Sequence, residues 1–445
     1  MTEGSIFQKI LFFSIPLILG NLLQQLYNTA DSIMVGNFVG SNALAAVGAS
    51  SSMIYLLIAF SQGAAVGAGV IVAQYLGARD KKSVSDAVHT SLVIAGILGI
   101  VLTIAGIVLS RQLLEWMRTP DEVMEQAVTY FRLYSAGMFF GIVYNMAAGI
   151  LNAAGNSKRS LLYLAVASFT NIVLDILFIA ILDMGVAGAA IATDISQAVS
   201  CILSMAFLMR VKDSYQVSLK KLKIHRRIAG SMIRVGLPTG IQNMVISLSN
   251  VLVQTSVNGF GAAAMAGYTA YLKVDGFNIL PVMSFSMAVT TFAGQNYGAG
   301  NYDRVKKGMY VTLAMGFVYT VLTGALLLTF DDQIMGMFSR DAEVITCGKL
   351  AMKYFCPFYF ILSILHGLSG ALRGVGKSIP PMVVLLLSLC VFRIFWIWLV
   401  LPHFSTIEGV YLLYPVSWAL GAVMIIIYAC TAKWLPAGRQ QGKVR

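Results

Sequence analysis

The sequence predicts an all-α polytopic membrane protein, with twelve transmembrane helices in two pseudo-symmetric six-helix lobes that form a parallel repeat. Three observations support this fold class: the composition, the number of long apolar segments and an internal repeat. Of the 445 residues, 58% are hydrophobic and only 11% are charged. Soluble domains carry about 25% charged residues, so the composition excludes an ordinary soluble domain.

Twelve apolar segments are long enough to span a bilayer, which requires about 20 residues of helix. The first segment is too long for a cleavable signal peptide and lacks a small-residue cleavage site, so we expect it to stay in the protein. The segments cover approximately residues 8–37, 43–76, 88–110, 126–153, 161–181, 187–208, 231–258, 264–294, 309–330, 349–373, 380–401 and 410–432.

Basic residues lie on alternate loops, which predicts the orientation in the membrane. One set of loops carries Arg79, Lys81, Lys82, Lys158, Arg159, the 209–230 linker, Arg304, Lys306, Lys307, Lys377, Lys433, Arg439, Lys443 and Arg445. The opposite loops hold most of the acids and only Arg111, Arg118 and Arg340. By the positive-inside rule, both termini are expected to be cytoplasmic, in a cell (inner) membrane protein. The net charge of +12 therefore indicates topology and contact with membrane lipids, and not nucleic acid.

The two halves of the chain repeat each other. SIPLILGNLLQQLYN matches GLPTGIQNMVISLSN, AQYLGARD matches GQNYGAGN, and GILNAAGNSKRS matches GALRGVGKSIPP. These matches pair Pro16 with Pro238, Gln74 with Gln295 and Gly149 with Gly370. We predict an N-lobe at 1–210, a basic cytoplasmic linker at 211–230 and a C-lobe at 231–445. Parallel repeats of this kind are typical of alternating-access transporters, whose sites lie at the repeat interface.

The first segment combines a lipid-compatible side with a polar side. Gly20, Gln24, Tyr27, Asn28 and Asp31 are spaced at helical intervals and share one face. A charge inside a membrane is costly and normally faces a bundle interior or a wet cavity, so Asp31 is a candidate functional residue. The alternative is that Asp31 lies at the mouth of the helix and is simply solvated. Pro16 removes a backbone hydrogen bond and predicts a kink or hinge.

A second acid lies in the same half, at Asp175, with Asn171 four residues before it. Segment 6 adds the Thr193 hydroxyl. The matching positions of the second half hold Val253, or Gln254 if the register slips by one residue, and Trp396, so the paired acids are confined to one lobe. Burial raises the pKa of a carboxyl group, and a neighbouring carboxylate raises one of the pair further, which suits proton exchange. Alternatively, the oxygens of these side chains can hold a hard cation such as sodium.

Other polar residues inside the segments leave two readings open. Asp194, Asp275 and Arg393 fit either a function or a buried interhelical contact, and His366 fits a hydrogen-bonded core histidine better than a proton carrier. The five cysteines have no metal-binding or disulfide spacing and read as packing residues. Neither a metal site nor a catalytic constellation is apparent, so we predict a protein that is not an enzyme and uses no cofactor other than the coupling ion H⁺ or Na⁺.

On these motifs, with LYNTADSIMVGNFVG in the first segment, the chain resembles multidrug and toxic compound extrusion (MATE) transporters over essentially its whole length. Pro16 with Asp31, and Asn171 with Asp175, resemble the DinF-like prokaryotic branch. The NorM-like branch places acids in segments 7 and 10, which contain no Asp or Glu here. The resemblance implies an antiporter that exports amphipathic or cationic compounds in exchange for protons or sodium. It assigns coupling to Asp31, Asn171, Asp175 and Thr193, with Gln24, Tyr27, Asn28 and Asn145 in the substrate cavity.

Two other functions compete with this interpretation. A flippase for a lipid-linked saccharide would have a cleft lined by intramembrane arginines, and Arg393 is the one mid-segment candidate. A membrane-embedded enzyme would need a nucleophile–base pair or a metal site. We expect a monomer that binds small amphipathic or cationic molecules. The exported compound and the choice between H⁺ and Na⁺ do not follow from the sequence, nor does the proximity of Asp31 to Asp175 without the resemblance.

Overall fold

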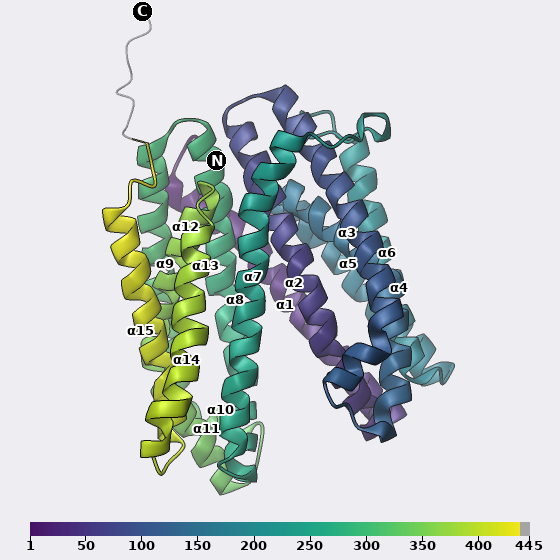
Figure 1. The fold of residues 1–445 in the computed structure, drawn as a ribbon, viewed down its shortest axis with the longest axis vertical. Coiled ribbons are helices and arrows are strands. Elements are labelled where there is room, and N and C mark those ends of the chain that lie inside the picture. The colour runs from purple at the N-terminus through teal and green to yellow at the C-terminus, as the bar shows by residue number, and fades with distance from the viewer. Residues whose placement is uncertain (437–445) are drawn as a thin grey trace, which may run out of the picture. The chain divides into compact units, whose positions relative to one another are not determined.

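The computed structural model describes residues 1–436, and these form an all-helical protein (Figure 1). The tail residues Arg439, Lys443 and Arg445, which entered the orientation argument, lie outside the described residues. The first half contains α1 (Ile6–Met34), α2 (Ser41–Gly77), α3 (Lys81–Trp116), α4 (Asp121–Ala153), α5 (Ser157–Asp175) and α6 (Gly185–Arg210). The second half contains α7 (Arg226–Asn258), α8 (Ala262–Gly298), α9 (Tyr302–Thr329), α10 (Asp331–Gly336), α11 (Ala342–Phe355), α12 (Tyr359–Gly374), α13 (Ile379–Leu385), α14 (Phe392–Phe395) and α15 (Glu408–Thr431).

Eleven helices in the described part of the chain are long and apolar enough to cross a membrane. The twelfth predicted segment is α7, which has 33 residues but does not meet that criterion of apolarity. The sequence of α7 explains its lower apolarity, because the helix begins with arginines and carries a row of amide side chains. The predicted fold class, with about eleven to twelve spans, is confirmed.

Two predicted segments are not simple α-helices. Segment 10 consists of α11 and α12 joined by a 3₁₀ turn at Cys356–Phe358, where Pro357 removes a backbone donor. Segment 11 alternates α-helix with π-helical turns at Leu386–Val391 and Trp396–Val400. π-turns also extend α1, at Val35–Val39, and α5, at Ile176–Ile181. The short helix α10, between α9 and α11, has no counterpart among the predicted segments.

The chain forms two compact units whose limits cut through two helices. One unit is Ile15–Gly240, and the other joins Met1–Ser14 to the chain from Ile241 onward. The start of α1 therefore belongs with the second half, and the start of α7 belongs with the first. The predicted lobe limits at 210 and 231 stay a prediction.

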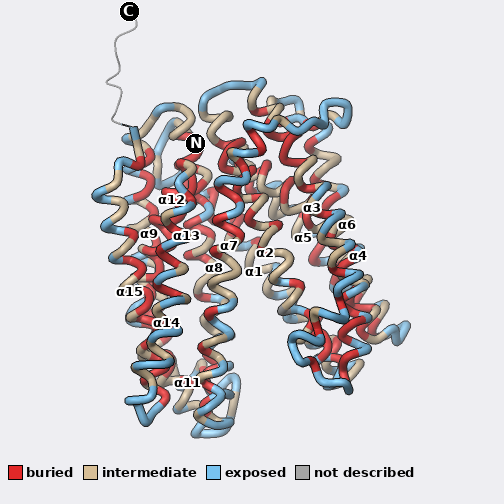
Figure 2. The backbone as a smooth tube through the Cα atoms, viewed as in Figure 1, coloured by how far each residue is buried: buried red, intermediate tan, exposed pale blue. Residues whose placement is uncertain are grey.

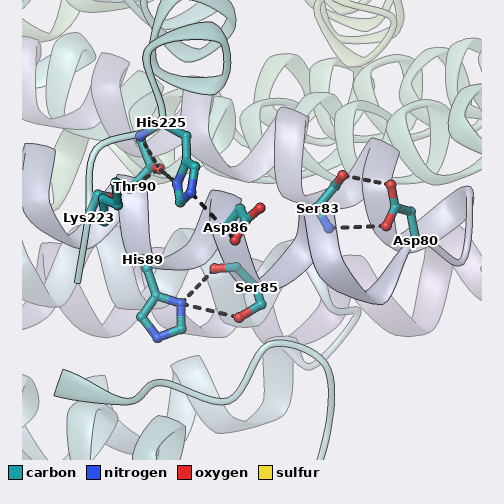
Figure 3. A network of polar contacts seen from close by, with 8 residues as sticks. All are labelled: Asp80, Ser83, Ser85, Asp86, His89, Thr90, Lys223 and His225. Carbon is teal, nitrogen blue, oxygen red and sulfur yellow. Dashed lines mark hydrogen bonds and ion pairs between the residues drawn. The ribbon is translucent and has the colours of Figure 1, made fainter. Parts of the chain in front are cut away.

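Within the unit Ile15–Gly240, α2, α4 and α6 pack against one another, and α3 packs on α2 and α4. Small side chains such as Ala147 are fully buried at these contacts, and buried positions follow the inward faces of the helices (Figure 2). The segment before α7 is anchored to the start of α3 (Figure 3). The His225 backbone N–H donates to the Thr90 hydroxyl at 3.2 Å, and the Ser218 N–H donates to His89 Nε2 at 3.0 Å.

Within the other unit, the core lies between α8, α9, α12 and α15 and is rich in aromatic rings. Phe355 stacks on Tyr271 with ring centroids 4.8 Å apart and meets Tyr414 edge-on at 4.6 Å. The first residues of the chain are held in this unit, because Arg304 at the start of α9 donates to the Gly4 carbonyl at 3.1 Å. The start of α3 thus holds the segment before α7, and the start of α9 holds the segment before α1. Both α7 and α1 contain a proline.

Candidate functional site

Asp31 lies near the end of α1 and is buried, with 9% of its surface exposed. The alternative of a solvated carboxylate at the helix mouth therefore does not hold. Its Oδ1 has no hydrogen-bond partner among the described residues. A buried polar atom without a partner is costly and calls for an explanation, such as an ion or a proton that completes it.

Asp175 is the last α-helical residue of α5, and it is 1% exposed. Neither of its carboxylate oxygens finds a partner in the described chain. One turn earlier, the Asn171 amide Nδ2 donates to the Thr193 hydroxyl of α6 at 3.5 Å, while Asn171 Oδ1 is unpartnered among those same residues. The predicted group Asn171, Asp175 and Thr193 thus lies at the α5–α6 contact, with Asn171 and Thr193 directly bonded.

The two acids lie within electrostatic range of each other, as the resemblance implies. The buried ring of Tyr130, on α4, is within range of both carboxylates and also of Asp194. The region therefore combines four oxygen atoms, on Asp31, Asn171 and Asp175, for which residues 1–436 supply no donor. A proton, or a cation that prefers oxygen ligands, can bind to such a group of acceptor oxygens.

The helices that carry Asp31 and Asp175 both change to π-helical geometry within four residues after the acid. The π-turn Val35–Val39 follows the α1 segment that carries Asp31, and the π-turn Ile176–Ile181 starts one residue after Asp175. π-turns occur frequently at functional sites because they re-aim side chains within a helix. Spacing counted at 3.6 residues per turn gives no signal for them, so they were not predicted.

Asp194 of α6 is a third acid of the same region. From the sequence, two readings stay open for it, a function or a buried interhelical contact. Gly137 of α4 makes room for it, because a Cβ built on Gly137 would lie 2.1 Å from the Asp194 carboxyl group. Asp194 Oδ1 is another buried oxygen without a partner among the described residues. One turn further along α6, Gln197 Nε2 donates to the Tyr134 hydroxyl at 3.2 Å.

The predicted cavity residues divide between two environments. Tyr27 shares the Asp31 side of α1 and bonds to Gln24, whereas the Gln24 and Asn28 side chains are exposed. Asn145 lies half-buried on α4, in the same unit. Pro16 is buried inside the continuous helix α1, and the limit between the two units falls two residues before it.

Asp275 and Arg393, two ionisable residues inside membrane-spanning segments of the second half, are hydrogen-bonded to neighbouring helices. Asp275 accepts from the Tyr359 hydroxyl at 2.7 Å, and Tyr271 bonds to Tyr359 at 2.5 Å. Arg393 donates to the Ser417 and Ser249 hydroxyls at 3.1 and 3.0 Å. Both residues therefore make buried interhelical contacts, and Arg393 does not offer the free guanidinium that a saccharide-lipid flippase would need. His366 is buried inside α12, as a core histidine.

A helical membrane protein with two repeated halves and buried, unpartnered acids in one of them belongs to the class of ion-coupled secondary transporters. The family model MatE matches the chain twice, over residues 16–177 and 238–399. The chain belongs to the MATE family. The double match also confirms the internal repeat, since each half of the chain matches the model separately.

Known proteins agree with this assignment. The chain is 29% identical to the probable multidrug resistance protein YpnP of Bacillus subtilis over 88% of both chains. It is 28% identical to the probable multidrug resistance protein YoeA of the same organism, over 96% of this chain and 94% of YoeA. A crystal structure of a MATE protein in complex with MaL6 superimposes with a TM-score of 0.90, at 25% identity and with 96% of each chain covered.

The predicted function is thereby confirmed at the level of a MATE multidrug efflux transporter, an antiporter of the membrane and not an enzyme. As in other MATE transporters, transport is coupled to an ion.

Proposed function

We propose that the chain exports amphipathic, often cationic compounds in exchange for a proton or a sodium ion bound at Asp31, Asn171, Asp175 and Thr193. The observation that carries this proposal is the set of buried oxygens on Asp31, Asn171 and Asp175 that have no donor among the described residues. A bound cation or proton stabilises these oxygens, and its release removes that stabilisation. Binding and release can therefore bias the helices that carry the acids between two arrangements.

The remaining features of the proposal follow from the sequence. Both termini are cytoplasmic, because the basic loops alternate. The protein works as a monomer. Alternating access operates between an N-lobe at 1–210 and a C-lobe at 231–445. The chain belongs to the DinF-like branch, since the acids lie in segments 1 and 5 while segments 7 and 10 lack Asp and Glu. Gln24, Tyr27, Asn28 and Asn145 contact the exported compound, and Pro16 acts as a hinge.

Transport by purified protein in liposomes tests the proposal. A fluorescent lipophilic cation should leave the liposomes when a pH or sodium gradient is imposed, and Asp31→Asn or Asp175→Asn should reduce the initial rate by at least about tenfold, or roughly 1.4 kcal/mol. Replacing sodium with choline at a fixed pH gradient identifies the ion. The matched control is Asp183→Asn, an exposed loop position with φ 50°, which Asn adopts readily.

The proposal fails if efflux proceeds at the same rate without any gradient. It also fails if Asp31→Asn and Asp183→Asn behave alike, because the buried carboxylate would then contribute no more than an exposed one.

A further inference from the structure

The second unit contains an open cavity, a hollow of about 500 Å³ at its surface, near the turn between α7 and α8. This volume lies in the range of small-molecule sites. The cavity is distinct from the region of Asp31 and Asp175, since all its lining residues belong to the unit that begins again at Ile241. It is lined by Gln254 and Asn258 of α7, by Met265, Ala266, Thr269, Ala270 and Lys273 of α8, and by Phe338.

Lys273 is an unusual residue for this position. It lies about 16 Å along α8 from Ala262, at 1.5 Å per residue, in a helix apolar enough to cross a membrane. Its side chain is exposed, and within residues 1–436 its ammonium group forms no ion pair and no hydrogen bond. The nearby acid Asp275 is bonded instead to the tyrosines Tyr359 and Tyr271. Unpaired charges inside membrane segments usually mark a ligand or ion pathway.

The α7 wall of the cavity continues a row of uncharged polar side chains. Gln254 Nε2 donates to Asn258 Oδ1 at 3.0 Å, which fixes the Asn258 carbonyl as acceptor and leaves the Asn258 NH₂ group as a donor toward the cavity. The row follows intervals of three and four residues and therefore occupies one helix face. It consists of Asn243, Ser247, Asn250, Gln254 and Asn258.

This row argues against a lysine that merely extends along lipid toward the membrane surface. A lipid-facing lysine would have apolar neighbours, whereas Lys273 shares its cavity with two amides and the Thr269 hydroxyl. The Thr269 hydroxyl itself donates to the Met265 carbonyl at 2.7 Å, so the cation and the amides remain as donors. No Asp or Glu lines the cavity.

We propose that this cavity binds the anionic group, a carboxylate or a phosphate, of an amphipathic ligand. Lys273 supplies the positive charge, and the Asn258 and Gln254 amides donate hydrogen bonds to the anion. Met265, Ala266, Ala270 and Phe338 contact the apolar body of the ligand. The site carries the opposite charge to the acidic region of the first half. This site adds to the proposed transport function, and binding of the anionic group to it requires no ion gradient.

Equilibrium binding to the full-length protein in uncharged maltoside micelles tests the site. The probes are a decanoate and a decylammonium that carry the same fluorophore, followed by fluorescence anisotropy. Lys273→Met removes the charge at nearly constant length and should weaken decanoate binding by about tenfold, as expected for a hydrogen-bonded charge, without weakening decylammonium binding. Lys273→Arg should retain binding. Lys353→Met, at an exposed α11 position outside the cavity, is the matched control.

Asn258→Asp provides a second variant at an exposed helix end, where folding is not at stake. It places a negative charge in the cavity and should also weaken decanoate binding. Repeating the measurement in phosphatidylcholine nanodiscs with and without phosphatidylglycerol distinguishes two sources of the anion. If phosphatidylglycerol competes with decanoate, and Lys273→Met abolishes that competition, the anion is a lipid phosphate. If phosphatidylglycerol does not compete, the anion belongs to a free ligand.

The proposal is overturned if Lys273→Met leaves decanoate binding unchanged or weakens both probes equally. Because no gradient is applied, such a failure would leave the proposed coupling at Asp31 and Asp175 untouched. Loss of gradient-driven efflux in Asp31→Asn with intact decanoate binding would separate the two sites in the same way.

Discussion

At the scale of single residues, the partners of a buried acid decide its role more than its position in an apolar helix does. Asp175 and Asp275 both lie within membrane-spanning helices. Asp275 is bonded to two tyrosine hydroxyls, while both oxygens of Asp175 lack a partner in the described chain. A satisfied carboxylate stabilises helix packing, whereas an unsatisfied one keeps its capacity to take up a proton or a cation.

Thr193 offers a direct test of how the coupling ion is held. Thr193→Val keeps the shape of the side chain but removes the oxygen that accepts from the Asn171 amide. We expect the apparent affinity for the coupling ion to fall by about tenfold, or roughly 1.4 kcal/mol, because Asn171 loses its orientation and a hydroxyl oxygen is lost. The measurement is the initial rate of efflux against the concentration of the driving ion.

Thr170→Val is the matched control for that experiment. Thr170 lies on α5 next to Asn171, but it is only half-buried and its hydroxyl donates to the Val166 carbonyl of its own helix. Equal effects of the two substitutions would show that loss of a threonine hydroxyl acts on the helices in general and not on ion binding.

Sequence spacing and the family resemblance could single out Asp31, Asn171, Asp175 and Thr193. They could not settle Asp194 or Asp275, because the environment of each depends on residues distant in the chain. The space beside Asp194 exists because Gly137 of α4 lacks a Cβ, and the bonds to Asp275 come in part from Tyr359, 84 residues away. Such contacts depend on how the helices pack together, and residue spacing within one helix gives no information about that packing.

At the scale of helices, the first part of α7 is joined to α2 by contact between backbones. Gly63 and Gly67 of α2 face Gly236 and Gly240 of α7, within the unit Ile15–Gly240. A Cβ on Gly67 would lie 2.4 Å from the Met232 carbonyl oxygen and 2.7 Å from the Gly236 Cα. Small residues at such crossings allow close van der Waals packing, which is a main source of helix association in membranes.

Gly67→Ala should therefore lower the thermal stability of the detergent-solubilised protein. The added methyl group meets backbone atoms, which cannot rotate away, and overpacking of this kind costs about 1–3 kcal/mol. Gly48→Ala in the same helix is the control, since a Cβ there meets nothing within 4 Å. That substitution should leave the melting temperature unchanged or raise it slightly, because Ala favours helix over Gly. Equal melting temperatures for both variants would contradict the close α2–α7 contact.

The helices themselves could largely be predicted, because long apolar segments that span a membrane have few alternatives to α-helix. Segment 10 illustrates the limit of that argument. Its hydropathy reads as one span, but the 3₁₀ turn at Cys356–Phe358 divides it into α11 and α12. Pro357 is the visible signal for that break, whereas the π-turns of segment 11 have none.

At the scale of the whole molecule, each half of the chain contributes a helix start to the unit formed mainly by the other half. The limits between the units fall at Ser14–Ile15 in α1 and at Gly240–Ile241 in α7. Both lie within two residues of a proline, Pro16 or Pro238, and these prolines are equivalent in the repeat. A helical proline lacks one backbone hydrogen bond and tolerates bending. We therefore predict that α1 and α7 bend at these two points during transport.

Pro16→Ala and Pro238→Ala should each slow transport by about tenfold, roughly 1.4 kcal/mol on the barrier, because a restored hydrogen bond stiffens the helix where the chain passes between units. Efflux rates in liposomes, normalised to the amount of inserted protein, measure the effect. Pro415→Ala is the control, since α15 lies entirely in one unit. If Pro415→Ala slowed efflux as much, the prolines would serve helix packing alone. If Pro16→Ala alone slowed it, bending would be confined to α1, and the symmetry of the repeat would not extend to the motion.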